Sequence, residues 1–382
     1  MLLLKETPVV KIQNDQLRFS ATDLVGYLNC RHLSGLEHAT AKGDIAKPKY
    51  YDPLLEALWE RGAKHEQDYV DHLASLGLQV IRIDGVEITD EAVAATIAAM
   101  KSGPDVIVQG ALRSGDWVGR ADILRKVETP SDLGGWSYEA FYTPRPRDNK
   151  GGTVLQLCLY SELVGDIQGL MLEFAYVVPP WSEFVPERYR VADFGAYYRQ
   201  VKGGMAASFA SGDPQETYPE PVAHCDICVW STSCDKQRRD DDHLCLVAGI
   251  SSLQISELKE HGVATGTQLA ELALPLPWKP EQGSLESFAR IREQARVQFE
   301  SRQAGELKFE LLTPVPDFGL ACLPEPDAGD IFLDFEGDSF VGEHGLEYLH
   351  GFHHFEDGEA HYQGLWALDR EGEKTAFETF ID

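Results

Sequence analysis

Long hydrophobic runs are missing from this chain of 382 residues. No stretch approaches the roughly 20 uninterrupted apolar residues that a helix needs to cross a bilayer. The apolar run at the N-terminus, residues 2–4, is shorter than the hydrophobic region of a secretory signal peptide. We therefore expect a soluble, cytoplasmic protein that has no membrane partner.

Basic residues are scarce. The chain has 34 lysines and arginines against 62 acidic residues, which gives a formal net charge of -28. Such a chain repels phosphate at long range, so binding to nucleic acid would require local basic patches. Basic side chains gather modestly in residues 120–126, 145–150 and 236–239. Each of these clusters is also what a solvated surface displays.

Cysteine is infrequent, and its number excludes one class of protein. Seven cysteines, an odd number spread unevenly through a long chain, do not match the disulfide framework of a secreted domain. Three of them, Cys225, Cys228 and Cys234, have the spacing C-x2-C-x5-C, and Cys30 lies far upstream. Four thiolates together suit an iron–sulfur cluster or a structural zinc ion. Taken alone, Cys30 is better explained as a small buried apolar residue.

The length of the chain and two proline-rich segments predict more than one domain. Closely spaced prolines cannot continue a helix, so residues 274–280 and 313–330 are expected to be linkers. We predict a first domain over residues 1–240, a helical linker region over 241–312 and a third part over 313–382. Because the third part is shorter than the roughly 100 residues of a typical domain, this chain is expected to be a fragment of a longer one.

The periodicity of apolar residues in the first domain predicts alternating helices and strands, and hence an α/β fold. Ser20 is a plausible N-cap for a helix that would contain Cys30. The predicted strands are residues 80–83, 106–109, 117–127, 136–142 and 169–178, and the predicted helices are residues 54–76, 90–101, 153–164 and 191–209.

Two of the predicted helices carry polar residues that suit catalysis. In helix 54–76, His65 shares a face with Tyr69 and His72, which follow it by four and seven residues. A single histidine on such a face is more often packed or solvated than catalytic. In helix 153–164, Gln156 and Tyr160 are four residues apart and also share a face.

Asp122 stands in the middle of the predicted strand 117–127, between the apolar residues Ala121 and Ile123. An aspartate in mid-strand is unfavourable by propensity. Such a local violation is common at functional or strained sites. The alternative explanation is a half-exposed strand at the edge of the sheet.

These segments, in this order, resemble the RecB-type nuclease branch of the PD-(D/E)xK superfamily, and specifically its members that carry a C-terminal cysteine cluster. The resemblance covers about residues 17–240, which is one domain-sized unit. It is carried by the RGxxHE segment at 61–66, the Gly-Arg-Ala-Asp segment at 119–122, the QxxxY helix at 156–160 and the four cysteines.

The resemblance implies a restriction-endonuclease-like fold, with a mixed sheet flanked by helices and closed by a [4Fe–4S] cluster on Cys30, Cys225, Cys228 and Cys234. Zinc remains the alternative occupant, because thiolate ligation alone does not distinguish the two. The resemblance also implies a DNA nuclease that acts in repair, recombination or defence, on single-stranded or end-bearing DNA.

The resemblance assigns catalytic roles to four residues. His65 and Asp122 would bind a catalytic Mg²⁺ or Mn²⁺ ion, and Gln156 and Tyr160 would place the DNA strand. The sequence departs from the family in the strand after Asp122. The family has Asp/Glu-x-Lys at this place, and this chain has Tyr-Thr-Pro at residues 142–144.

Neighbouring residues do not replace the missing acid and lysine. Glu139 is three residues from Tyr142 and is therefore expected on the opposite face of the strand. Arg145 cannot act as a base, because its side chain is always protonated. The alternatives to an active nuclease are a catalytically silent DNA-binding module and a zinc-stabilised interaction scaffold, which the acidity of the chain favours.

The third part of the chain begins with a predicted strand that carries Asp334 and Glu336 on one face, with residues 348–352 as its partner. The pair resembles the first motif of RNase H-like, DEDD-type 3′–5′ exonucleases, in which it begins a two-metal site. The later acidic motifs would lie beyond Asp382, and in related architectures a helicase domain follows. The simpler explanation of the pair is an exposed strand face.

Residues 246–272 have the pattern of a helix–turn–helix within the helical linker region. They resemble a helix–hairpin–helix module, which usually contacts the DNA backbone through N–H groups at a turn. Ordinary packing of two helices explains the same pattern.

Overall fold

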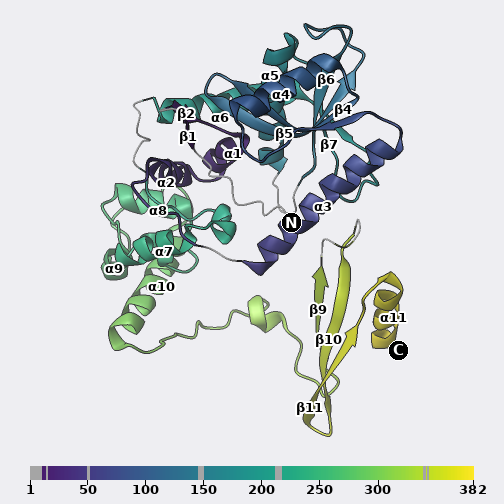
Figure 1. Cartoon of the computed structure of the whole chain (residues 1–382). Coiled ribbons are helices and arrows are strands. Elements are labelled where there is room, and N and C mark those ends of the chain that lie inside the picture. Colours follow the sequence, from purple (N-terminus) through teal and green to yellow (C-terminus); the bar gives the residue numbers. More distant parts are fainter. Residues whose placement is uncertain are drawn as a thin grey trace. The chain divides into compact units, whose positions relative to one another are not determined.

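The computed structural model describes residues 11–13, 16–49, 52–144, 150–210, 217–338, 341 and 344–382. The chain divides into two compact units (Figure 1). The first contains residues 3–52 and 199–313, and the second contains residues 53–198 and 314–382. Each unit is therefore built from two separate stretches of the sequence. Within the described ranges, no helix is long and apolar enough to cross a membrane.

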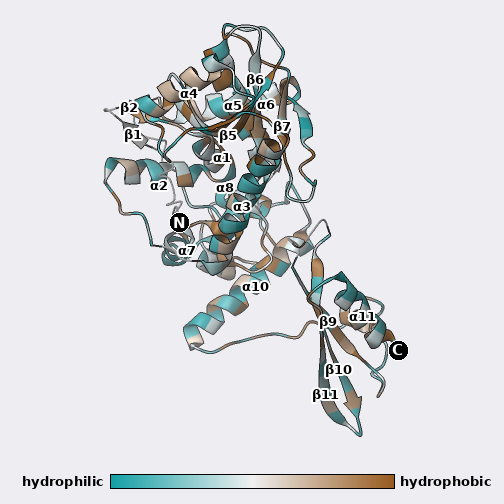
Figure 2. Cartoon of the chain, turned by 45° about the vertical axis from the view of Figure 1, so that its right-hand side comes forward, coloured by the Kyte–Doolittle hydropathy of each residue, from teal (hydrophilic) through white to brown (hydrophobic). Residues whose placement is uncertain are grey.

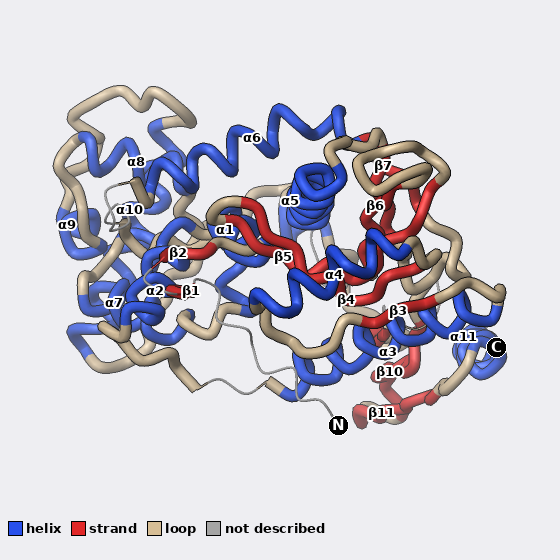
Figure 3. The backbone as a smooth tube through the Cα atoms, turned by 45° about the horizontal axis from the view of Figure 1, so that its top comes forward, coloured by secondary structure: helices blue, strands red, loops and turns tan. Residues whose placement is uncertain are grey.

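A six-stranded mixed sheet is the core of the second unit (Figure 3). Its strand order is β3-β4-β5-β6-β7-β8, in which the pairs β3–β4 and β6–β7 are parallel and the others are antiparallel. The predicted α/β class is thereby confirmed. The strands are β3 (Val80–Arg82), β4 (Val106–Ser114), β5 (Trp117–Val127), β6 (Ser137–Tyr142), β7 (Phe174–Val177) and β8 (Glu187–Arg190).

Helices cover both faces of this sheet. Residues of α3 (Pro53–Ser75) pack with Phe141 in one cluster of buried side chains, and residues of α5 (Lys150–Gln168) pack with Tyr142 in another. Phe141 and Tyr142 are neighbours in β6, so their side chains point to opposite faces. α3 and α5 therefore lie on opposite sides of the sheet. A third helix, α4 (Asp90–Ser102), packs against β4.

α5 is longer than the predicted helix 153–164, and β7 is shorter than the predicted strand 169–178. Gly169, with a φ of +68°, follows the last residue of α5 in the left-handed conformation that often ends a helix. The apolar residues just after it therefore connect α5 to β7 and do not extend the strand. β8 was not predicted, because its sequence Glu-Arg-Tyr-Arg lacks an apolar alternation.

The first unit begins with α1 (Ala21–Asn29) and α2 (Arg31–Lys42). Ser20 caps α1 as predicted, because its hydroxyl accepts the Asp23 N–H at 3.3 Å. The prediction that Cys30 lies inside this helix is wrong. Cys30 has an extended backbone, with φ −158° and ψ 109°, and separates α1 from α2. The apolar spacing continues across this break, so periodicity did not reveal it.

The remainder of the first unit is mainly helical. The predicted helix–turn–helix at 246–272 is confirmed, since α8 and α9 are joined by a short turn and pack with α10 around Leu258, Leu269 and Phe288. The elements are β1 (Lys11–Gln13), β2 (Gln16–Arg18), η1 (Ala223–Ile227), α7 (Ser231–Asp240), η2 (Leu244–Leu246), α8 (Ser252–Glu260), α9 (Gly266–Glu271), α10 (Leu285–Ala304) and the end of α6 (Val191–Ser208), which begins in the second unit.

The C-terminal residues of the second unit form a three-stranded antiparallel sheet with the order β11-β10-β9. The predicted strand at 330–338 and its partner at 348–352 are both present, as β9 and β10. β9 lies at the edge of this sheet with most of its side chains exposed, and Figure 2 shows apolar residues along β9 and β10. The elements are η3 (Gly319–Cys322), β9 (Phe332–Asp338), β10 (Leu346–Glu356), β11 (Glu359–Trp366) and α11 (Arg370–Ile381).

Candidate metal centre and sheet site

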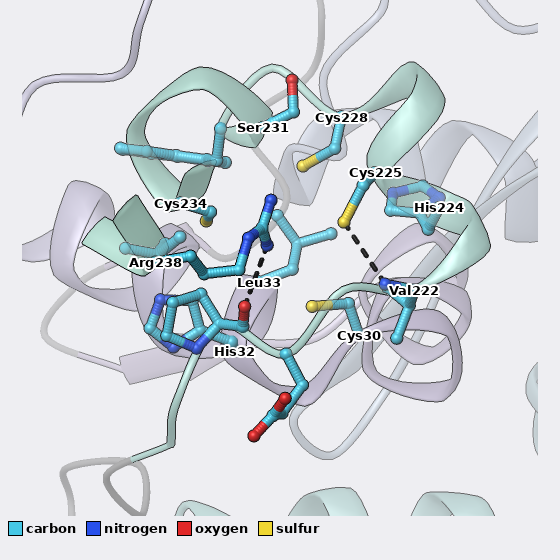
Figure 4. Close-up of a pocket in the computed structure, with 14 residues that line it drawn as sticks. Cys30, His32, Leu33, Val222, His224, Cys225, Cys228, Ser231, Cys234 and Arg238 are labelled. Atoms are coloured by element: carbon cyan, nitrogen blue, oxygen red, sulfur yellow. Dashed lines mark hydrogen bonds between the residues drawn. The ribbon is translucent and has the colours of Figure 1, made fainter. Parts of the chain in front are cut away.

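Four cysteines from two distant parts of the first unit line one cavity (Figure 4). Cys30 comes from the junction of α1 and α2, whereas Cys225, Cys228 and Cys234 come from η1, the loop after it and α7. The cavity has a volume of about 20 Å³. The structure therefore brings together the four residues that the sequence grouped by spacing.

Local backbone geometry fixes where each thiol projects. The Cys30 N–H donates to the Gly26 carbonyl at 2.8 Å, which ends α1 directly before the cavity. The Cys228 N–H donates to the Cys225 carbonyl at 3.3 Å, so these two thiols belong to one tight turn. The Cys225 sulfur accepts the Val222 N–H at 3.5 Å. Hydrogen bonds of this kind support thiolates that bind iron–sulfur clusters.

A buried hydrogen bond ties α2 to the segment that carries the three later cysteines. The indole N–H of Trp230 donates to the Glu37 carboxylate at 2.9 Å, across 193 positions of sequence. Glu37 is only 3% exposed, and Lys47 pairs with it at 3.3 Å. A buried carboxylate is tolerated when it is paired and hydrogen-bonded. This contact therefore holds Cys30 and the C-x2-C-x5-C segment in one body.

Burial controls the protonation of the thiols in the absence of a metal. It raises the pKa of Cys228 above its ordinary value, and the neighbouring Cys30 and Cys225 thiols add to this effect. Burial also raises the pKa of Cys234 to about 11, and the positive charge of Arg238 opposes the shift. The Cys228 and Cys234 thiols therefore hold their protons at neutral pH, and a metal that binds these two must displace the protons.

The chemistry of the donor set fits a thiolate-bound metal group, because four soft sulfur ligands face one partly buried space. Within the described ranges, no group of three or more histidine, cysteine, aspartate or glutamate side chains is already arranged to hold a metal ion.

Asp122 lies in mid-strand, in an interior strand of the sheet. β5 pairs with β4 on one side and with β6 on the other, so the explanation of Asp122 as part of an edge strand is wrong. The Asp122 carboxylate oxygen Oδ2 accepts the Thr143 N–H at 3.0 Å and the Thr143 hydroxyl at 2.9 Å. Sequence reasoning missed this contact, because Thr143 was considered only as the middle residue of a degenerate motif.

Gln109 is a second residue that sequence reasoning missed. In the pairing of β4 with β5, Val108 lies opposite Ile123 and Gly110 lies opposite Ala121, so Gln109 lies opposite Asp122. The φ of Gln109 is +56°, which is strained for a residue with a side chain. Its amide nitrogen donates to Glu66 at 2.8 Å, and its carbonyl accepts from Arg120 at 2.7 Å. Gln109 thereby connects the RGxxHE helix segment to the strand of Asp122, which no local sequence signal indicates.

His65 projects from α3 toward the end of β7. Its Nε2 lies 2.7 Å from the Val178 carbonyl oxygen, which can only accept, so Nε2 carries the proton. The predicted face shared by His65, Tyr69 and His72 is confirmed, because all three rings stack on Phe184 at centroid distances of 6.2, 5.9 and 4.9 Å. Packing against Phe184 therefore explains why these three aromatic side chains share one face of α3.

Tyr160 of α5 packs directly on the strand that carries Asp122. A Cβ atom at Gly119 would lie 2.8 Å from Tyr160 Cε1, so only glycine allows this approach. Tyr160 is buried and Gln156 is half-buried. The helix of Gln156 and Tyr160 and the strand of residues 119–122 are therefore in contact, whereas His65 belongs to the helix on the opposite side of the sheet.

Glu139 does not take the place of the missing acid. It is paired across the strands with Arg125 and lies on the face of Phe141, opposite to that of Tyr142, as predicted. Burial raises the pKa of its carboxyl, and Arg125 and Arg188 oppose the shift. Arg145, the other neighbour that we considered, lies outside the described residues.

Side chains of two of the predicted basic clusters are paired within the chain, and residues 145–149 of the third lie outside the described residues. Arg120 donates to the carbonyls of Gln109 and Glu87, and Lys126 pairs with Asp105 at 3.3 Å. In the cluster at 236–239, Lys236 pairs with Asp240, Arg239 pairs with Asp235 at 2.7 Å, and Arg238 is buried. These side chains therefore serve local structure.

Asp334 and Glu336 lie on the exposed strand β9. The Phe335 ring contacts His350 edge-on at 4.8 Å, and His350 in turn faces Phe377 of α11. Phe335 therefore points to the α11 side, and the two acids point to the other face.

Comparison with known proteins finds no family model that matches this chain and no match among curated proteins.

Proposed function

We propose that this chain is a RecB-like, DNA-binding protein closed by a [4Fe–4S] cluster, and that the Asp122 site cleaves DNA poorly or not at all. The observation that carries the proposal is the convergence of Cys30, Cys225, Cys228 and Cys234 on one cavity. Cys30 precedes Cys225 by 195 positions and lines the same cavity as the other three cysteines, which a shared metal group would explain.

The cluster would be held by the four cysteines and would supply a covalent cross-link between the two chain segments of the first unit. The chain's own residues prepare the site. Glu37 and Trp230 hold the segments in register, the Val222 N–H is directed at one sulfur, and burial limits the access of water to the thiols.

The surroundings of Asp122 support impaired cleavage. Metal-dependent phosphodiester hydrolysis requires several oxygen ligands and a positioned water. One carboxylate oxygen of Asp122 already accepts two hydrogen bonds from Thr143. Tyr142 is buried in the α5-side core, where a second acid would be expected, and Pro144 stands in place of the lysine.

Binding to DNA is proposed from the order of the motifs. Arg61 and Lys64 are exposed on α3 beside His65, but Arg61 pairs with Asp338 at 3.2 Å and the helix has more acidic than basic residues. The charge of this helix therefore adds no support for contact with phosphate.

A structural zinc ion in the same cavity is the second candidate. Four thiolates also suit a tetrahedral zinc ion, and thiolate ligation alone does not distinguish zinc from an iron–sulfur cluster.

The experiment combines metal analysis with a DNA assay on protein purified without oxygen. We expect a brown protein that contains iron and acid-labile sulfide and that binds single-stranded DNA, with little Mn²⁺-dependent cleavage. Asp122→Ala should change cleavage no more than the control Asp116→Ala, which alters the turn between β4 and β5.

Each alternative has its own outcome in this experiment. A colourless protein with stoichiometric zinc would favour the second candidate. Robust cleavage that Asp122→Ala abolishes would contradict the impaired site. Absence of DNA binding would overturn the proposed role on DNA. The metal centre would then be tested separately by the iron, sulfide and zinc content.

A further inference from the structure

Arg238 is a buried cation beside the four thiols. It follows Cys234 by four residues in α7, so the two side chains share a face of the helix. Arg238 is 6% exposed and lines the same cavity as the cysteines. Figure 4 shows its guanidinium extending between Cys234 and the other sulfurs. Its Nη1 donates to the Pro219 carbonyl at 2.9 Å, which fixes the position of the charged group.

The carboxylates near Arg238 are shared with other cations. Asp235 pairs with Arg238 Nη2 at 3.7 Å and with Arg239 at 2.7 Å. Glu220, which also lines the cavity, pairs with Lys259 at 3.0 Å. A buried charge is costly unless a counter-charge lies close to it. Because Asp235 is shared with Arg239, a further negative charge in the cavity would stabilise Arg238.

We propose that Arg238 is the counter-ion and a hydrogen-bond donor of the metal centre on Cys30, Cys225, Cys228 and Cys234. This inference rests on the proposed function. Four thiolates carry a net charge of about −2 with a Zn²⁺ ion or with an oxidised [4Fe–4S] core. An arginine stays protonated at all accessible pH values and has five N–H donors, of which the Pro219 carbonyl uses one.

The effect of Arg238 has a definite sign. Positive charge and N–H donors near the sulfurs favour the more negative, reduced form of a cluster. Removing the charge should therefore lower the reduction potential. For a zinc centre, the same removal should weaken retention of the metal.

The test uses the full chain with three variants. Arg238→Gln removes the charge but keeps a donor for the Pro219 carbonyl, Arg238→Lys keeps the charge, and Lys236→Gln is the matched control at an exposed position of the same helix. We expect Arg238→Gln to lower the ratio of reduced to oxidised cluster at a fixed potential at least tenfold, about 59 mV for one electron. Arg238→Lys should retain most of the wild-type potential, and Lys236→Gln all of it.

If the protein holds zinc, the measurement is the rate of zinc release to a chelator. Arg238→Gln should then release zinc at least tenfold faster than Lys236→Gln. If Arg238→Gln fails to fold, the test rests on Arg238→Lys. If Arg238 had a purely structural role through its planar guanidinium, the lysine variant would be equally defective.

A metal-loaded Arg238→Gln protein with an unchanged potential, or with unchanged zinc release, overturns the role of Arg238 and leaves the proposed metal centre intact. Equal defects in Arg238→Gln and Arg238→Lys overturn it as well. A wild-type protein that contains neither iron nor zinc overturns the metal centre, and this inference with it.

Discussion

Individual polar residues inside the sheet are held by partners that come from other strands. Asp122 is stabilised by Thr143 from the end of β6. Gln109 bridges Glu66 and Arg120 at the cost of a strained backbone. Strain of this kind is found where a surrounding structure determines one conformation, often at ligand sites. The contacts of Gln109 with Glu66 and Arg120 are what hold this strained backbone beside Asp122.

Glu139 gives a prediction for the dependence of stability on pH. Burial raises its pKa in the folded protein. Folding therefore favours the protonated carboxyl of Glu139. Its contribution to the free energy of unfolding is present at low pH and is lost as the pH rises through the folded-state pKa. Glu139→Gln should remove this loss, so that the free energy of unfolding falls less as the pH rises above about 4.5. Urea unfolding at a series of pH values measures the effect.

Glu128→Gln, at an exposed position after β5 in the same unit, serves as the control for Glu139→Gln. If Glu139→Gln steepens the loss of stability with pH, or if Glu128→Gln flattens it equally, the buried carboxyl of Glu139 is not responsible.

Among the elements, β5 and α5 determine the shape of the sheet site, because Tyr160 occupies the space left by the missing side chain of Gly119. The ring is buried, and Leu163 also lies within 3.1 Å of the position of a Cβ atom at Gly119. Neither neighbour can move outward without disturbing the core. Glycine is therefore required at position 119, because α5 packs over it.

Gly119→Ala should destabilise the second unit, because the new methyl group would meet the Tyr160 ring at 2.8 Å. Overpacking of a core costs about 1–3 kcal/mol. Gly135→Ala is the matched control, since a Cβ atom there meets nothing within 4 Å. Thermal and urea unfolding of both variants measure the difference, and equal stability of the two would show that α5 retreats at little cost.

At the scale of the whole molecule, the four cysteines join the two stretches of sequence that make up the first unit. Cys30 belongs to residues 3–52, and the other three belong to residues 199–313. The sheet unit is inserted between these stretches. The predicted domain boundaries at 240 and 312 remain predictions, as do the DEDD-type role of Asp334 and Glu336 and the helicase domain expected beyond Asp382.

Cys228→Ser should destabilise the first unit, because the free energy of metal binding contributes directly to folding. We expect faster proteolysis within residues 3–52 and 199–313, together with loss of bound metal. Cys322→Ser is the matched control, because Cys322 is an exposed cysteine of the second unit. Unchanged protease resistance and metal content in Cys228→Ser would count against a metal that holds these segments together.

The sequence by itself determined the features that depend on local periodicity. Apolar spacing and caps located α3, α4, β5, β6 and the helix pair of α8 and α9, because a helix or a strand imposes its own repeat on the side chains that it buries. The spacing of Cys225, Cys228 and Cys234 likewise predicted a group of thiols, since a tight turn and the first turn of a helix bring them close.

Only the tertiary structure decided the contacts that join distant segments. The contact of Asp122 with Thr143, the bridge through Gln109 and the buried position of Arg238 depend on groups from other segments, and Trp230 reaches Glu37 across 193 positions. The break of the helix at Cys30 was likewise visible only in the structure. Local sequence carries no record of such approaches, because their free energy arises from packing and burial in the folded chain.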